Sequence, residues 1–183
     1  MDGVSESVRW LLLAYRIPSE PTRLRAGVWR ALKALGAIYV QNAVAAVPED
    51  PTAERALRAL RAEIAQMDGA TAQLLCADTL VGGRDLIDAY NAARDDEYAE
   101  IVDRCQDFVA DLDKETAAAH FSYGELEEND EDLTKLRGWF DKVAARDRLG
   151  AAGRDTAAKA LEECGHNLDR FAQAVYAADT DAP

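Results

Sequence analysis

The hydrophobic pattern of this sequence changes its period once, at Gly82-Gly83. Before these glycines, short apolar runs alternate with helical stripes, and after them the apolar residues follow three-four spacing. Short runs bounded by Pro or Gly are typical of buried strands, whereas three-four spacing is typical of helices that pack along one side. The sequence therefore predicts an α+β part over residues 1–80 and an all-helical part over residues 81–183.

The first part contains four predicted strands and two predicted helices. The apolar run Trp10–Tyr15 forms the first strand, and a helix follows it. Residues 37–41 and 44–47 are interpreted as a hairpin, although one long strand would also fit. A helix capped by Asp50 and a strand over residues 71–77 complete the order strand, helix, two strands, helix, strand. This is the ferredoxin-like arrangement.

The second part contains three predicted helices. Each carries an apolar stripe with three-four spacing, so we expect an antiparallel three-helix bundle or a helical hairpin. The first of these helices spans about 30 residues, or ~45 Å at 1.5 Å per residue. Such a helix is long enough to offer a dimer surface, and we expect a homodimer.

The charge is divided in the same way as the period. The net charge is −13, yet residues 1–80 hold nine basic and nine acidic side chains, while residues 81–183 hold 12 and 25. The acidic balance argues against tight, non-specific binding of nucleic acid or anionic membranes by the whole molecule. It does not exclude a local anion site in the neutral part.

Other features favour a cytoplasmic protein. No apolar run reaches the roughly 18 residues that a membrane-spanning helix needs. Residues 1–6 are acidic and polar, unlike a signal peptide. Cys76, Cys105 and Cys164 are far apart and odd in number, so we interpret them as reduced, buried and chemically inert. The three tryptophans, Trp10, Trp29 and Trp139, are interpreted as core or interface residues.

Four motifs in order resemble the N-terminal domain of the ChrB family. They are WLLLAYRIP (10–18), GAIYVQN (36–42), DEYAEI (96–101) and HFSYGELEENDED (120–132), and the resemblance covers residues of about 8 to 178. ChrB proteins are associated with bacterial chromate resistance and described as chromate-responsive regulators, so the resemblance implies transcriptional regulation. These proteins usually continue into a second, C-terminal domain. The sequence ends at Pro183, so if sensing needs the second domain, we expect that this chain either lacks the activity or works with a partner that supplies it.

The sheet part also resembles, more weakly, the effector-side domain of phenylacetate-type repressors and the small ferredoxin-like nuclease of CRISPR adaptation. In those nucleases an acidic residue after the first strand holds a divalent metal. Arg16 stands at that position here, and a cation does not ligate Mg²⁺. We therefore assign no catalytic residues.

The candidate ligand site lies where the first strand meets the first helix. Arginine side chains and the free N–H groups of a helix N-terminus stabilise oxyanions, and chromate is a tetrahedral dianion. We predict that this junction binds an oxyanion such as chromate. The alternative is a solvated helix face that pairs with the acidic helices. The predicted ligand-binding residues are Arg16, Arg23, Arg25, Arg30, Gln41 and Asn42.

A second basic stripe, formed by Arg55, Arg58 and Arg61, lies on the second predicted helix. Together the two basic helices could bind DNA on one face despite the net charge. The favoured interpretation is that these arginines pair with the acidic helices, within one chain or across a dimer.

The acidic run over residues 125–132 follows a histidine closely. His120, Glu125 and Glu128 are a candidate site for a divalent transition metal, since histidine and carboxylates ligate such ions. The alternative is a solvated helix start, where carboxylates meet the positive end of the helix dipole. No other cofactor is expected.

A polar network is predicted in the helical part. Arg94 can pair with Glu97 or Glu100 one turn away, and Asn129 and Arg137 of the next helix are expected to join them. We expect this network to set helix register rather than to perform catalysis.

We therefore interpret the chain as a regulatory module that binds an oxyanion, DNA or a partner rather than one that catalyses a reaction. One alternative is a metal-dependent enzyme or metal-binding protein that uses His120 and the carboxylates of residues 125–132. Another is an interaction protein that binds another protein through its helical hairpin.

Overall fold

A computed structural model describes residues 8–180. Residues 1–7 and 181–183 lie outside the described residues. They include the acidic N-terminal segment and the last residues of the predicted helical part. The fold is mixed α+β. In chain order the elements are β1 (Arg9–Arg16), α1 (Thr22–Ala34), β2 (Ile38–Gln41), β3 (Val44–Pro48), α2 (Pro51–Ala65), β4 (Thr71–Asp78), α3 (Gly83–Ala117), α4 (Tyr123–Arg146) and α5 (Arg154–Thr180).

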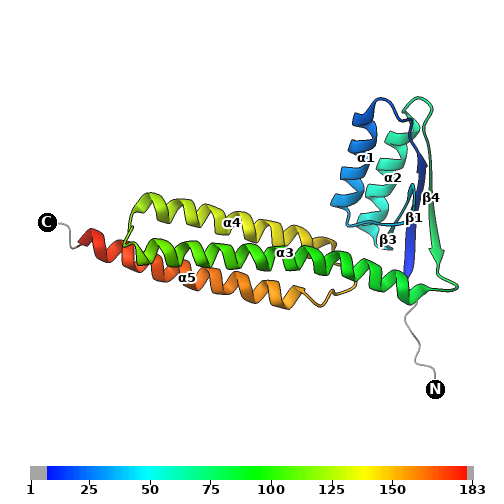
Figure 1. Ribbon diagram of the computed structural model, residues 1–183. Coiled ribbons are helices and arrows are strands. Elements are labelled where there is room, and N and C mark those ends of the chain that lie inside the picture. Colours follow the sequence, from blue (N-terminus) through cyan, green and yellow to red (C-terminus); the bar gives the residue numbers. More distant parts are fainter. Residues whose placement is uncertain (1–7, 181–183) are drawn as a thin grey trace, which may run out of the picture. The chain divides into compact units, whose positions relative to one another are not determined.

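The four strands form one antiparallel sheet in the order β2-β3-β1-β4. Leu13 of β1 pairs with Ala45 of β3, and Tyr39 of β2 pairs with the same alanine. Helices α1 and α2 lie on one face of the sheet (Figure 1). Directly paired residues project to the same face, so this register places Leu13, Ala45 and Tyr39 together.

Local sequence signals explain where these elements begin and end. The Asp50 carboxylate accepts hydrogen bonds from the N–H groups of Thr52 (2.7 Å) and Ala53 (3.0 Å), so the predicted cap of α2 is confirmed. Gly36 ends α1 with a φ of 73°, the left-handed conformation that glycine adopts without strain. The turn between β2 and β3 confirms the hairpin interpretation of residues 37–47.

The chain divides into two compact units. The sheet unit contains the residues up to Ala93 together with Arg146–Leu149, and the helical unit contains Arg94–Ala145 and the residues from Gly150 onward. The period change at residues 82–83 coincides with the start of α3, whereas the two units divide inside that helix.

The sheet unit has its own apolar core. Trp10 is buried, and its ring and the Tyr90 ring pack in a T-shaped arrangement with 5.8 Å between centroids. The other buried core residues are Leu11, Leu13, Val28, Leu32, Ala45, Ala46, Val47, Ala53, Leu57, Leu60, Ile64 and Ala72.

The segment Arg146–Leu149 contributes a partly buried arginine to the sheet unit. The Arg148 guanidinium donates to the Asp50 carboxylate and to the carbonyl of Leu35 (2.9 Å), at the C-terminal end of α1. Partial burial alone would raise the pKa of Asp50, but the N–H of Ala53, Arg148 and the N–H of Thr52 together hold that pKa below its ordinary value. Asp50 therefore caps one helix and pairs with a residue 98 positions away.

In the helical unit, α3, α4 and α5 run side by side (Figure 1) and share a second apolar core. The three-four stripes predicted from the sequence supply this core. Its buried residues are Tyr98, Ile101, Cys105, Phe108, Leu112, Leu133, Val143, Ala151, Ala157, Leu161, Cys164, Leu168, Phe171 and Val175. Among residues 8–180, no helix is both long enough and apolar enough to cross a membrane.

Candidate functional site

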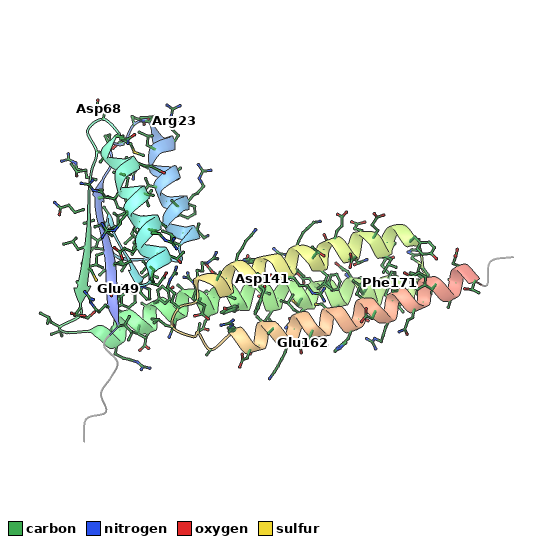
Figure 2. The ribbon with its side chains drawn as sticks, turned by 180° about the vertical axis from the view of Figure 1, so that it is seen from behind. Arg23, Glu49, Asp68, Asp141, Glu162 and Phe171 are labelled. Carbon is green, nitrogen blue, oxygen red and sulfur yellow. The ribbon has the colours of Figure 1, made fainter. Side chains whose placement is uncertain are left out.

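A groove in the sheet unit lies where β1 ends, α1 begins and the turn between β2 and β3 passes. Its volume is ≈ 1080 Å³. Figure 2 labels Arg23 and Asp68 at this end of the sheet unit and Glu49 toward the other end. The residues that line the groove are Tyr15, Arg16, Ile17, Ser19, Thr22, Arg25, Ala26, Trp29, Tyr39, Asn42 and Ala43.

Helical and strand geometry explain why these side chains meet. Thr22, Arg25, Ala26 and Trp29 are spaced i, i+3, i+4 and i+7, so they share one face of α1. A different face of the same helix carries Val28 and Leu32 into the core. The groove residues therefore occupy the side of α1 that the core leaves uncovered.

The sheet contributes the other wall of the groove. Tyr15 lies two residues after Leu13, so it projects to the same face of β1, where the paired strands also place Tyr39. The hydroxyl groups of Tyr15 and Tyr39 are hydrogen-bonded at 2.9 Å. Partial burial and this hydrogen bond raise the pKa of Tyr39 far above its ordinary value, so its hydroxyl stays neutral.

The groove is electropositive in an acidic protein. None of its lining residues is acidic. Within the described part of the chain, neither Arg16 nor Arg25 forms an ion pair, whereas Arg9, Arg58 and Arg84 each pair with a carboxylate. Two uncompensated arginines beside a carboxylate-free surface attract anions.

The N-terminus of α1 adds to the positive charge around the groove. Pro21 occupies the N-cap position and makes no side-chain cap, and the first turn contains no acidic residue. Positive side chains near the positive end of a helix dipole are unfavourable, and a bound anion would relieve the repulsion. Helix α2 shows the usual solution, with Asp50 as the cap and Glu54 in the first turn.

Two large aromatic side chains line the groove and remain exposed. Trp29 is 50% exposed and Tyr39 is 45% exposed. The Lys33 ammonium lies over the Trp29 ring, 5.2 Å from its centroid. Of the three tryptophans predicted as core or interface residues, Trp10 is buried and Trp139 is partly buried against the helical core, whereas Trp29 is exposed and is therefore not a core residue.

The predicted ligand residues separate into two groups. Arg16, Arg25 and Asn42 line the groove. The other three, Arg23, Arg30 and Gln41, are exposed and are not among its lining residues. The Arg30 side chain instead donates to the carbonyl of Ala26, one turn earlier in its own helix (3.3 Å).

The basic stripe of α2 is engaged in local contacts. Arg58 pairs with Glu54 at 2.6 Å, and Arg61 donates to the carbonyl of Ala72 at 3.3 Å. Arg55 donates to the carbonyl of Pro51 in the preceding turn. Of these three arginines only Arg58 is paired with a carboxylate, because a hydrogen bond to a carbonyl oxygen does not neutralise the charge of Arg55 or Arg61.

The predicted metal ligands are not gathered into one site. His120 is exposed, and its Nδ1 lies 3.0 Å from a carboxylate oxygen of Glu115. Glu125 and Glu128 lie on α4, where the backbone N–H of Glu125 donates to Ser122 Oγ at the helix start. No group of three or more His, Cys, Asp and Glu residues between positions 8 and 180 is arranged to hold a metal ion.

The predicted polar network is also dispersed. The buried Arg94 approaches Glu97 at 3.4 Å, while Glu100 is exposed. Asn129 donates to the carbonyl of Glu125 and lines a groove that includes Asp107, which is about 20 Å along α3 from Arg94 at 1.5 Å per residue. Arg137 lies instead against α5, where a Cβ at Gly165 would come within 3.0 Å of its Nη2.

The cysteine interpretation is right for two residues and wrong for one. Cys105 and Cys164 are buried, with the Cys164 thiol 3.5 Å from the carbonyl of Cys105. Cys76 is exposed because β4 is an edge strand, and its thiol donates to Glu49 at 3.4 Å. Loss of hydration and this hydrogen bond raise the pKa of the Cys76 thiol, which keeps it protonated.

Comparison with known proteins gives one match. No curated protein and no solved structure shows significant similarity to the chain. The model of the family described as protein ChrB, N-terminal, matches residues 25–182. The match begins inside α1 and covers every later element, so it includes Arg25, Trp29 and Tyr39, whereas Arg16 and Thr22 lie before it. The chain therefore belongs to the ChrB N-terminal family, as its four motifs indicated.

Proposed function

We propose that this chain is a regulatory module of chromate resistance that binds a small oxyanion in the groove between α1 and the sheet. The observation that carries the proposal is a groove lined by Arg16 and Arg25, with no carboxylate among its lining residues, in a chain of net charge −13. The family supports a link to chromate, which is a tetrahedral dianion.

The geometry suits an oxyanion in three respects. Arginine forks donate two parallel hydrogen bonds to anionic oxygens. The hydroxyl groups of Ser19 and Thr22 and the amide of Asn42 add neutral donors along the same groove. The uncapped start of α1 contributes backbone N–H groups that face no competing carboxylate in its first turn.

Calorimetric titration with chromate, sulfate and phosphate, against chloride at matched ionic strength, tests this proposal. A hydrogen bond to a charged group is worth about 1.5–3 kcal/mol, so Arg25→Gln should weaken oxyanion binding by roughly tenfold or more. The matched control is Arg30→Gln, on the same helix but outside the groove lining, and it should bind like the wild type. The absence of binding, or binding that neither Arg16→Gln nor Arg25→Gln weakens, would refute the proposal.

The finer architecture is also a proposal. We propose that the sheet unit is a ferredoxin-like domain, supported by the strand order β2-β3-β1-β4. We also propose that the helical unit is a three-helix bundle, supported by the core shared among α3, α4 and α5.

We further propose a homodimer and a cytoplasmic location. The long α3 and the three cysteines, none of which forms a disulfide, support these two points. Analytical ultracentrifugation across a concentration series tests the homodimer, and a monomer at every concentration would refute it.

A further inference from the structure

A bare oxyanion would occupy only part of the groove. A tetrahedral oxyanion presents four oxygen atoms, so it fills on the order of four water volumes, or ~120 Å³. The groove measures ≈ 1080 Å³, slightly above the ~300–1,000 Å³ range that is typical of sites for organic ligands. Most of the groove would remain empty around chromate or sulfate.

The part of the groove beyond the arginines is built from aromatic side chains. Trp29 of α1 and Tyr39 of β2 keep about half of their surface exposed, and Tyr15 lies beside Tyr39. Aromatic rings left exposed in a concave surface are typical of sites that stack a flat ring of the ligand. The hydrogen bond between the two tyrosine hydroxyls holds their rings in place without a ligand.

Polar groups accompany both parts of the groove. Arg16 and Arg25 supply two positive charges, which match a dianion better than a single carboxylate. Asn42, Ser19 and Thr22 supply neutral donors and acceptors that can meet the edge of a heterocycle or a sugar hydroxyl. A ligand that satisfies all of these groups combines a phosphate, hydroxyl groups and a flat heteroaromatic ring.

We propose that the groove binds a nucleoside phosphate, either as a free mononucleotide or as a nucleotide of a single strand. The base stacks on Trp29 and Tyr39, and the phosphate meets Arg16 and Arg25. This inference rests on the proposed function, because it assigns the same two arginines to an anionic group. It goes further in naming an organic ligand that the aromatic wall recognises.

Titration calorimetry with fragments of a nucleotide distinguishes binding of a nucleoside phosphate from binding of an oxyanion alone. The probes are adenosine and uridine 5′-monophosphate, the matching nucleosides, ribose 5-phosphate, sulfate and chromate. Each nucleotide should bind at least tenfold more tightly than its nucleoside and than ribose 5-phosphate, because each fragment lacks one half of the recognition. A ten-residue single strand and its duplex complete the panel and distinguish a free nucleotide from a strand.

Variants assign the binding to the groove. Removing one stacking platform should weaken nucleotide binding about fivefold or more, so Trp29→Ala is the principal variant and Tyr39→Ala the second. Trp29→Ala should leave sulfate binding unchanged, whereas Arg25→Gln should weaken both ligands. Arg30→Gln is the matched control that should weaken neither, and circular dichroism melting verifies that each variant is folded.

The results of these titrations show whether the nucleotide inference fails alone or together with the proposed oxyanion function. If sulfate and chromate bind in an Arg25-dependent way and nucleotides bind no more tightly than ribose 5-phosphate, this inference is wrong and the proposed function survives. If no anion binds, both are wrong. Tighter binding of the duplex than of the single strand, insensitive to Trp29→Ala, would also overturn the inference because a paired base cannot stack in the groove. Single-strand binding that exceeds mononucleotide binding and is lost in Trp29→Ala supports it.

Discussion

Replacing Asp50 tests how a residue of the α4–α5 connection stabilises the sheet unit. One oxygen of this carboxylate accepts from Thr52 and Ala53 and caps α2, and the other accepts from Arg148. Asparagine caps a helix as well as aspartate does, whereas alanine does not. Asp50→Asn therefore removes only the charge that pairs with Arg148, and Asp50→Ala removes the cap as well.

The expected magnitudes follow from burial. The side chains of Asp50 and Arg148 are 29% and 15% exposed, so their pair lies between a surface pair, worth about 0–1 kcal/mol, and a buried one, which costs about 3–5 kcal/mol to break. We expect Asp50→Asn to lower the free energy of unfolding by about 2 kcal/mol. Loss of the cap adds about 1 kcal/mol, so Asp50→Ala should cost about 3 kcal/mol.

A double-mutant cycle with Arg148→Met isolates the pair. In that background Asp50→Asn should cost less than about 0.5 kcal/mol, because no cation remains for the carboxylate to meet. Urea unfolding followed by tryptophan fluorescence in a Trp139→Phe background reports on the sheet unit, which retains Trp10 and Trp29. Equal costs of Asp50→Asn with and without Arg148 would refute the reasoning, as would equal costs of Asp50→Asn and Asp50→Ala.

Three further predictions use single positions. The pKa of Asp50 is lower in the folded chain than its ordinary value of 3.8. The stability that its carboxylate contributes is therefore complete above pH 3.8 and is lost as the pH falls through the folded pKa. In acid unfolding, the free energy of unfolding of the wild type should fall over this range more than that of Asp50→Asn. Gly165→Ala should raise the unfolding free energy of the helical unit by about 0.5–1 kcal/mol, because alanine favours a helix and the flexible tip of Arg137 can move from the new methyl group; a lower urea midpoint would contradict this. Native protein should take up one equivalent of a thiol reagent, at Cys76, and more slowly than free cysteine at pH 7 because the thiol pKa is raised; modification of all three thiols without denaturant would contradict the burial of the other two.

Periodicity predicted the elements well because it is a local property. The apolar run that starts at Trp10 and the stripes of the three long helices appear in the structure as β1, α3, α4 and α5. The cap at Asp50 was equally visible, because the residues that it serves lie within three positions. Cys76 was placed wrongly because a strand sequence does not say whether it lies at the edge or the centre of a sheet.

The candidate site could be predicted only in part. Arg16 and Arg25 stood out because they flank one strand-helix junction. The aromatic wall was not predicted, because Trp29 was interpreted as a core or interface residue although it lies outside the apolar stripe of its helix. The relation of Tyr15 to Tyr39, which lie 24 positions apart, depends on strand pairing. One signal was present but not used: the spacing of Thr22, Arg25, Ala26 and Trp29 defines a helix face separate from the apolar one.

The sequence by itself determined the two classes of structure in this chain, the family to which it belongs and the charge that gathers in its helical half. These are properties of residues close together along the chain. Only the tertiary structure decided that Arg148 reaches Asp50, that His120 and the carboxylates near it form no cluster, and that Arg16, Arg25, Trp29 and Tyr39 share one groove. The reason is physical: which helix face stays uncovered and which strands pair depend on burying apolar surface across the whole unit, and no local spacing records that outcome.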